Sequence, residues 1–395
     1  MQPRRRPSPL LMNGHHTAEE FPRNNTRKHI QLCFFMVVVC AIYYIIDVSE
    51  KDYMKKSSAR MEVLNQPINL QSKPSKRSFI LEPEDEFTPQ ICWLMSFPNS
   101  GTSFTMTMVA RASNRSFASN YADEVTAPDQ MDSLSIYPRR PEGPYWAGLS
   151  GKIAFPRQLP EKYIITKTHC GSRCVNCGPD EYVETPAVFL RKCASGHARM
   201  GNQRRRVDVE YPPDRVYRAI HLIRHPLHNI IARFHLEHRH RDRSGKYKSW
   251  VATHPNNATG LQSWCADLNE EFRTQDERFF GKESLPNVPC RGEFFKFTQW
   301  HNLVHEGLEL IEHEVPVLTV YYEDYQVNFN ETVKTILDFL ELKHVGVLRE
   351  FQARSDYGEY FTKEQRQEIF AFIKKTANTK TWKQIEHYFG DGYYD

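Results

Sequence analysis

The sequence predicts a doubly wound α/β fold, a parallel sheet with flanking helices, preceded by one transmembrane helix. Four short apolar runs have the length and composition of buried parallel strands: ICWLM at 91–95, YIITK at 163–167, AIHLI at 219–223 and VPVLTVYY at 315–322. Segments with a helical spacing of apolar residues separate or follow these runs, the clearest at 330–342 and 363–377. Strands that alternate with helices indicate a parallel sheet covered on both faces.

The N-terminal segment predicts a membrane anchor. Residues 1–29 contain six arginine or lysine residues and two glutamates, and the following run, IQLCFFMVVVCAIYYII at 30–46, has no charge. As a helix this run spans about 25 Å at roughly 1.5 Å per residue, which is just enough for a thin bilayer. A cleaved signal peptide is the alternative, but 29 residues are long for its charged region and no small-residue cleavage site precedes Asp47. We therefore expect an uncleaved signal anchor over 30–48.

Charge and composition around the anchor predict the orientation and the domains. Positive residues before the span favour a cytoplasmic N-terminus, so 1–29 is expected to be a cytoplasmic basic tail. Because short spans sort to early secretory membranes, we expect a single-pass type II protein of the Golgi membrane. Residues 49–88 are polar and interrupted by prolines, as in a stem, and a luminal domain is expected over 89–395. Three sequons in this domain predict a glycoprotein: Asn114, Asn257 and Asn330.

Seven cysteines follow the anchor, and an oxidising lumen would pair most of them. Cys265 and Cys290 are expected to close a loop around the polar segment between them. Four further cysteines form a cluster that predicts two more disulfides: Cys170, Cys174, Cys177 and Cys193. The two-residue gap within this cluster also suits a structural zinc site, which is the alternative. Cys92, in the first predicted strand, is expected to be a buried thiol.

The stretch SFPNSGTSFT, residues 96–105, connects the first predicted strand to a predicted helix. In such a turn the backbone N–H groups around Ser100, Gly101 and Thr102 can point at one anion, and the helix start adds a partial positive charge. Thr102 and Ser103 add hydroxyl donors. An ordinary strand-to-helix turn with a Ser/Thr cap is the alternative. The first glycine and the lysine of a Walker A loop are absent, which argues against an ATPase.

The same stretch closely resembles the 5′-phosphosulfate loop of the sulfotransferases that use 3′-phosphoadenosine 5′-phosphosulfate (PAPS), usually aromatic-Pro-Lys-Ser-Gly-Thr-Thr-aromatic. Six positions match: Phe97, Pro98, Ser100, Gly101, Thr102 and Phe104. The resemblance implies a P-loop-like nucleotide-binding fold with PAPS as co-substrate. It also implies the residues that bind this donor: Asn99, Ser100, Gly101, Thr102, Ser103 and Phe104. Asn99 departs from the family pattern, which has lysine here, so an amide stands in place of a positive charge.

The second predicted strand ends in IITKTHC, residues 164–170, where KTH is similar to the family segment that carries the catalytic histidine. The resemblance implies that His169 is the general base and that Lys167 neutralises charge on the transferring sulfonate. The position supports this, because side chains at the end of a parallel strand face the crevice where such sheets bind ligands. Imidazole also suits proton removal near neutral pH. A polar residue in a cysteine-rich loop is the alternative interpretation of His169.

The third predicted strand and the helix after it, IHLIRHPLHNIIARF at 220–234, resemble the family's 3′-phosphate segment. That segment has Arg-x-Pro and a serine eight residues after the arginine. Arg224 and Pro226 match, and an arginine fork suits a terminal phosphate. A surface ion pair is the alternative for this arginine. The serine is replaced by Ala232, and Arg233 or a residue of the basic segment described next is the candidate to supply the missing donor.

Two features near these motifs have several interpretations. Five histidines crowd the third motif: His225, His228, His235, His238 and His240. No cysteine or carboxylate completes an evident metal set with them, so no metal is expected. The basic segment RKCASGHARMGNQRRR, at 191–206, could recognise a sulfated or carboxylated polysaccharide, or be a solvated loop or a processing site.

The last predicted strand and its end, VLTVYYEDY at 317–325, are similar to the family strand that ends in Tyr-Glu-Asp. The resemblance places Tyr322 near the nucleotide. The four motifs occur in the family order between about residues 91 and 342. Together they imply a sulfotransferase that moves a sulfonate group from PAPS to an acceptor hydroxyl or amine.

The acceptor and partners are predicted less directly. Carbohydrate is the first expectation for the acceptor, because the anchor places the domain in the secretory pathway. Residues 51–395 have 46 basic and 44 acidic residues, a net charge of +2, so no nucleic acid partner is expected. The alternative function is a membrane-tethered nucleotide-binding protein of the same fold without turnover, because Asn99 and Ala232 replace two usual donor contacts.

Overall fold

The computed structural model describes residues 88–121, 125–126, 131–136, 144–146, 157–172, 177–200, 205–282, 287–348, 351, 357 and 359–390. The chain divides into two units, Met1–Ile80 and Leu81–Asp395, and every described residue belongs to the second. The predicted tail, the anchor over 30–48 and nearly all of the predicted stem lie outside the described residues. Within the described residues, no helix is both long and apolar enough to cross a membrane.

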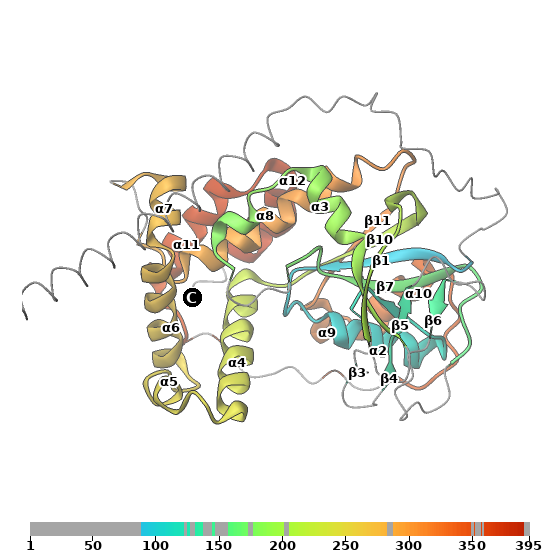
Figure 1. The fold of residues 1–395 in the computed structure, drawn as a ribbon, viewed down its shortest axis with the longest axis horizontal. Coiled ribbons are helices and arrows are strands. Elements are labelled where there is room, and N and C mark those ends of the chain that lie inside the picture. The colour runs from blue at the N-terminus through green and yellow to red at the C-terminus, as the bar shows by residue number, and fades with distance from the viewer. Residues whose placement is uncertain are drawn as a thin grey trace, which may run out of the picture. The chain divides into compact units, whose positions relative to one another are not determined.

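A seven-stranded sheet runs through the described part of the chain in the order β11-β10-β1-β7-β2-β5-β6 (Figure 1). Its larger part consists of the four predicted strands: β1 (Gln90–Ser96), β7 (Tyr163–Thr168), β10 (Val216–Ile223) and β11 (Val317–Tyr321). Three short strands complete it: β2 (Ala118–Ser119), β5 (Leu134–Ile136) and β6 (Tyr145–Trp146). All neighbours pair in parallel except β5 and β6. The predicted parallel sheet is confirmed.

The central strand β1 is buried on both faces. Leu94 of β1 lies opposite Lys167 of β7 and Ile220 of β10, and Ile91–Met95 are all inaccessible to solvent. A strand covered on both sides needs apolar residues at every position, which is why β1 reads as a continuous apolar run rather than an alternating one.

Helices α2 (Thr102–Ser113) and α10 (Phe329–Phe339) cover one face of the sheet (Figure 1). Cys92 and Leu94 of β1 point into this face, and Cys92 is a buried free thiol, as predicted. The apolar face predicted for 330–342 packs here, because Val333, Ile336, Leu337 and Leu340 belong to the same core cluster. The first helix of this face begins where the strand-to-helix turn of the first motif ends.

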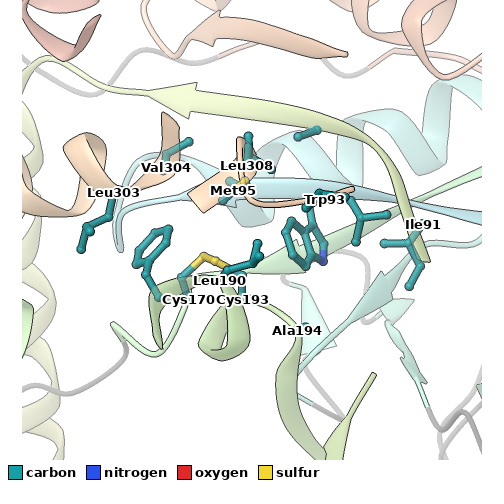
Figure 2. Close-up of a cluster of buried hydrophobic side chains, with 14 of the residues drawn as sticks. Ile91, Trp93, Met95, Cys170, Leu190, Cys193, Ala194, Leu303, Val304 and Leu308 are labelled. Carbon is teal, nitrogen blue, oxygen red and sulfur yellow. A yellow bond between two sulfur atoms is a disulfide. The ribbon is translucent and has the colours of Figure 1, made fainter. Parts of the chain in front are cut away.

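Helices α3 (Pro186–Cys193) and α8 (Arg291–Leu308) cover the other face. Figure 2 shows Trp93 and Met95 of β1 in this cluster, with Leu190 of α3 and Leu303 and Leu308 of α8. The indole N–H of Trp93 is not left unpaired in this apolar setting. It donates to the Tyr211 hydroxyl at 2.8 Å.

Six further helices build a third apolar cluster beside the sheet, around Phe234, Phe294 and Ile369. They are α4 (Pro226–Ser244), α5 (Lys248–Thr253), α6 (Ala258–Glu271), α7 (Arg273–Phe280), α11 (Lys363–Thr376) and α12 (Thr379–Ile385). Helix α11 confirms the helix predicted at 363–377. Thr362 and Gln365 start it with a capping box, in which each side chain accepts a hydrogen bond from the other residue's backbone N–H.

The basic segment 191–206 is not a loop. It contains the end of α3, the strand β8 (Ser195–Met200) and the start of β9 (Arg205–Glu210), which pair as an antiparallel hairpin. The sequence obscured this because polar and small residues alternate with few β-branched ones in β8. A second two-stranded sheet is formed by β3 (Val125–Thr126) and β4 (Met131–Asp132).

Disulfides link the described cysteines other than Cys92, as predicted. Two are described in full: Cys170–Cys193 and Cys265–Cys290. Cys177 is disulfide-bonded as well, and Cys174 lies outside the described residues. The zinc interpretation of this cluster is therefore wrong, because oxidised sulfurs cannot be thiolate ligands.

Candidate active site

The predicted site residues follow the carboxyl ends of four neighbouring strands. The loop 97–101 follows β1, His169 follows β7, Arg224 follows β10 and Tyr322 follows β11. Since the carboxyl ends of parallel strands lie at one edge of a sheet, the fold gathers these segments there. The N–H of Tyr322 donates to the Ile223 carbonyl (2.8 Å), which extends the pairing of β10 and β11 into the site.

The loop 97–101 has a backbone that few residue types adopt without strain. Asn99 has φ 69° and Gly101 has φ 98°, both in the left-handed region. A Cβ at Gly101 would come within 2.1 Å of Tyr322 Cδ2, so glycine is required against this ring. Asparagine tolerates a positive φ better than lysine does, which gives Asn99 a conformational reason.

The start of α2 presents backbone N–H groups without a side-chain cap. Gly101 is the N-cap residue, and the first turn contains no acidic residue. The Thr105 N–H donates to the Gly101 carbonyl at 3.0 Å. The N–H groups of Thr102, Ser103 and Phe104 precede this bond, so they have no partner within the helix and can bind an anion, assisted by the helix dipole.

The hydroxyl of Thr102, one of the two predicted hydroxyl donors, bonds inside the protein, and so does the hydroxyl of Ser100. Thr102 Oγ1 lies 2.6 Å from Ser96 Oγ, and Ser100 Oγ accepts a hydrogen bond from Asn229 Nδ2 at 3.0 Å. Both residues are buried, whereas Ser103 is exposed. The groups that face outward from this turn are therefore its backbone N–H groups and the Ser103 hydroxyl. Their role in donor binding stays a prediction.

His169 is held in one tautomer beside the loop. Its Nδ1 lies 2.6 Å from the Ser96 carbonyl oxygen, which can only accept, so Nδ1 carries the proton. In the neutral ring, Nε2 then has the lone pair that a general base needs. The His169 N–H donates to the Tyr121 hydroxyl (2.7 Å), and Trp300 Nε1 donates to the His169 carbonyl (3.1 Å). The Tyr121 ring also stacks on the imidazole, with centroids 5.7 Å apart.

Lys167 lies two residues before His169 in β7. It pairs in register with Leu94 of β1 and Ser119 of β2, near the carboxyl edge of the sheet. Strand alternation places it on the same face as Ile165, the face that α2 covers. Lys167 is only 6% exposed, so its side chain is buried in the protein near the carboxyl edge of the sheet. Charge neutralisation on the sulfonate stays a prediction for this residue.

Arg224 contacts two of the other predicted binding residues. Its Nη1 donates to the Asn99 carbonyl (2.8 Å), and its guanidinium carbon lies 4.7 Å from the centroid of the Tyr322 ring. Its Nε is buried and has no hydrogen-bond partner among the described residues. An arginine fork with a buried donor still to be satisfied fits a bound phosphate.

Aromatic rings gather around Tyr322 next to the loop. Phe104 lies edge-on to it with centroids 6.4 Å apart, and Phe351 does so at 5.5 Å. These rings form an apolar surface that ends at the Arg224 guanidinium. Such a surface suits the flat ring of a nucleobase.

Residues 89–389 match the family model described as the sulfotransferase domain. The chain belongs to the sulfotransferase family. The matched range contains every site residue described above, and the family uses PAPS as its sulfonate donor. The prediction of an enzyme that takes PAPS as co-substrate is therefore confirmed.

Two solved structures resemble this sulfotransferase. One is the sulfotransferase from Alicyclobacillus acidocaldarius, at 13% identity and a TM-score of 0.36, covering 75% of this chain and 96% of that chain. The other is the mouse sulfotransferase SULT7A1 complexed with PAP, at 14% identity and a TM-score of 0.34, covering 78% of this chain and 94% of that chain. The curated proteins give no significant match.

The sulfotransferase site has a supporting carboxylate, Glu323, that the motifs did not single out. Its Oε1 accepts from the His225 N–H (3.1 Å), and its Oε2 accepts from the Tyr388 hydroxyl (2.7 Å). Burial alone would raise the pKa of Glu323, but hydrogen bonds from His228, Tyr388 and the His225 N–H lower it. The ionised carboxylate therefore fixes the residue that directly follows Arg224.

Two of the crowded histidines of the sulfotransferase, His225 and His235, bond to protein groups. His225 Nδ1 accepts from the Leu227 N–H (3.1 Å) as the N-cap of α4. His235 lies 2.6 Å from Asn256 Oδ1 through Nδ1 and 3.1 Å from the Tyr360 hydroxyl through Nε2. In the described part of the chain, no group of three or more His, Cys, Asp or Glu residues is arranged to hold a metal ion.

Arg233 does not stand in for the serine that Ala232 replaces. Its Nε donates to Glu293 Oε2 (2.6 Å), and its guanidinium lies 5.0 Å from the Phe97 ring centroid. Lys296 pairs with the same glutamate. Burial alone would raise the pKa of Glu293, but Arg233 and Lys296 lower it to about 2. The Arg233 guanidinium therefore forms a buried ion pair with Glu293.

Proposed function

We propose that this sulfotransferase sulfonates a hydroxyl or amine group of a carbohydrate in the Golgi lumen, with His169 as the general base. The observation that carries the proposal is the bond from His169 Nδ1 to the carbonyl of Ser96, the last residue of β1. The loop 97–101, which follows Ser96, is called the donor loop below. This bond ties the base to the loop and leaves Nε2 to accept the acceptor's proton.

Three features of the site fit PAPS. The uncapped start of α2 suits the 5′-phosphosulfate, and the buried Nε of Arg224 suits the 3′-phosphate. The rings around Tyr322 suit the adenine. Bound PAPS supplies the sulfonate and, in its phosphate, the leaving group.

In the proposed reaction His169 Nε2 takes the proton of the acceptor hydroxyl as the acceptor oxygen bonds to sulfur. The bond between sulfur and the phosphate oxygen breaks in line with this attack, and the 3′,5′-bisphosphate leaves. The N–H groups at the start of α2 stabilise charge on the leaving phosphate. Asn99 can donate a hydrogen bond but cannot cancel charge, so Lys167 supplies most of the neutralisation at the sulfonate.

The proposed location rests on the sequence and on the disulfides. The apolar run at 30–46 follows a basic tail, which favours a type II anchor. The Cys170–Cys193 and Cys265–Cys290 disulfides are of the kind that persists in the secretory pathway. The carbohydrate acceptor follows from this location, because glycans are the abundant hydroxyl-bearing polymers of that lumen.

The acceptor proposal is tested with full-length protein purified in detergent and radiolabelled PAPS. Pooled carbohydrates, tyrosine-containing peptides and small alcohols are offered separately. Label in the carbohydrate pool supports the proposal, and label confined to peptides or small alcohols overturns the acceptor class. PAP is the 3′,5′-bisphosphate that remains when PAPS has lost its sulfonate. Binding of PAP without transfer to any pool would favour the nucleotide-binding protein without turnover.

The topology proposal is tested in cells. Tags are placed at either end of the full-length chain, and intact vesicles are treated with protease. Protection of the C-terminal tag together with loss of the N-terminal tag, in membranes that carry a Golgi marker, supports the type II orientation. The reverse pattern overturns it.

A further inference from the structure

We propose that Asn229 is a positioning residue that holds the donor loop in the conformation in which its N–H groups face the donor. The inference rests on the proposed function of the loop 97–101. Asn229 lies in α4 and is fully buried, and its Nδ2 is 3.0 Å from both the Pro98 carbonyl oxygen and Ser100 Oγ. These two atoms flank Asn99, whose backbone is left-handed at a φ of 69°.

The orientation of the Asn229 amide follows from its partners. The Pro98 carbonyl has no proton to give, so it must face the NH2 group rather than Oδ1. The same NH2 group donates its second proton to Ser100 Oγ. An aspartate of the same shape would offer no proton to Pro98, so the contact requires the amide and not merely a side chain of this size.

Residues 224–229 hold three consecutive residues of the loop. Arg224, two residues before α4, donates to the Asn99 carbonyl at 2.8 Å, and Asn229 donates to the groups on either side of it. The peptide between Asn99 and Ser100 cannot rotate without breaking one of these bonds. Such a rotation would also break the bond from the Ser100 N–H to the Phe97 carbonyl, and it would displace the N–H groups that follow at the start of α2 from a bound anion. The segment proposed to bind the 3′-phosphate therefore also shapes the loop for the 5′-phosphosulfate.

Asn229 is an unfavourable residue for fold stability alone. Its Oδ1 is buried without a hydrogen-bond partner among the described residues, and an unpaired buried acceptor costs free energy. The neighbouring residues Ile230 and Ile231 are fully buried, so this part of α4 accommodates apolar side chains. The contact with the donor loop gives the reason for an asparagine here.

The test compares Asn229→Ala with Asn302→Ala in the full-length protein purified in detergent. Asn302 is a matched control, because it is also a buried helical asparagine and its Nδ2 donates to the Thr376 carbonyl (3.0 Å), away from the loop. The first readout, without donor, is hydrogen exchange of the Ser100 N–H, which donates to the Phe97 carbonyl. The others are PAP affinity and the kcat and KM values for PAPS.

We expect Asn229→Ala to speed exchange at Ser100 and to weaken PAP binding by about tenfold or more, because the two hydrogen bonds from its amide to the loop are lost. The KM for the acceptor should stay the same. Asn302→Ala should change none of these values, even if it lowers the melting temperature. Ser100→Ala combined with Asn229→Ala should cost less than the sum of the two, because both remove the same bond.

Two other results have distinct meanings. Equal Ser100 exchange and equal PAP affinity in Asn229→Ala and Asn302→Ala would overturn the positioning role. If the wild-type protein binds no PAP while Asn229→Ala still speeds exchange at Ser100, the proposed function fails and the structural basis of the positioning role stands.

Discussion

The ring of Tyr322 lies so close to Gly101 that a Cβ at position 101 would be 2.1 Å from its Cδ2 and 2.3 Å from its Cε2. Gly101 follows β1 and Tyr322 follows β11, two strands that are separated by β10 in the sheet. The contact therefore spans β10 and joins the donor loop to the aromatic surface. It also makes the loop backbone intolerant of any side chain at this position.

Gly101→Ala should weaken PAP binding by roughly ten- to a hundredfold, because it adds both a clash and strain at a φ of 98°. Calorimetric titration of the full-length protein with PAP measures the change. Gly245→Ala is the control, since Gly245 also has a positive φ but a Cβ there would meet no atom within 4 Å. It should lose stability and keep PAP affinity; equal affinities in both variants would contradict a shaping role for the Tyr322 contact.

Arg224→Ala should weaken PAP binding by about 1.5 to 3 kcal/mol, the usual range for a hydrogen bond to a charged group. It should also remove most of the preference for PAP over adenosine 5′-phosphate, which lacks the 3′-phosphate. Arg218→Ala is the control. Arg218 pairs with Glu341 near the start of β10, whereas Arg224 follows the carboxyl end of this strand. If the preference for PAP survives in Arg224→Ala, the 3′-phosphate has been assigned to the wrong residue.

His169→Ala should lower kcat by about 100-fold or more, the usual contribution of a general base, while PAP affinity stays near the wild-type value. Single-turnover transfer of radiolabelled sulfonate measures the chemical step. His240→Ala, at an exposed position of α4, should leave the rate unchanged. Near-normal turnover in His169→Ala would remove His169 from the mechanism.

Asn99→Lys should lower kcat/KM for PAPS by about three- to tenfold, although it restores the residue usual in the family. Lysine would adopt the left-handed backbone of residue 99 at a cost of about 1 kcal/mol. The Arg224 guanidinium already binds the carbonyl of residue 99, so a lysine there would add a second cation close to it. Asn99→Gly should keep PAP affinity, because glycine relieves the strain. A large rate gain in Asn99→Lys would show instead that the site lacks only charge.

Glu293→Gln should destabilise the fold at pH 7 by about 3 to 5 kcal/mol, because Arg233 and Lys296 would lose their buried partner. The pKa of Glu293 is depressed from 4.5 to about 2. Its contribution is therefore complete above pH 4.5 and lost as the pH falls toward 2. Urea unfolding across this range measures it. Asp338→Asn, in an exposed pair with Lys334, should cost under about 1 kcal/mol; equal losses would contradict a buried network.

The main strands could be predicted because each contains a short, largely apolar run, as in Ile91–Met95 of β1. The short strands β2 and β5 could not, because two or three residues carry no recognisable period. Strand β2 takes its place in the sheet by pairing with β7, and β5 by pairing with β2, and both are tertiary contacts. The hairpin of β8 and β9, which begins within 191–206, was missed for a related reason. It is stabilised by the pairing of its two strands and not by strand-forming residues in β8.

The motif residues could be located because each one follows a predicted strand. The residues that support them could not, since their roles come from contacts between distant segments. Asn229 is 131 positions from Pro98, and Tyr121 is 48 positions from His169. No local pattern marks such residues, and only the fold brings them to the loop and to the base.

The hydrogen bond from Tyr388 to Glu323 sets the earliest moment at which the enzyme is complete during translation. The donor loop leaves the ribosome early and Arg224 follows, but Glu323, which fixes the residue after Arg224, waits for position 388. A nascent chain shorter than this contains every motif and lacks one partner of that carboxylate. Completion of the site therefore waits for a residue 65 positions after Glu323, well beyond the last of the four motifs.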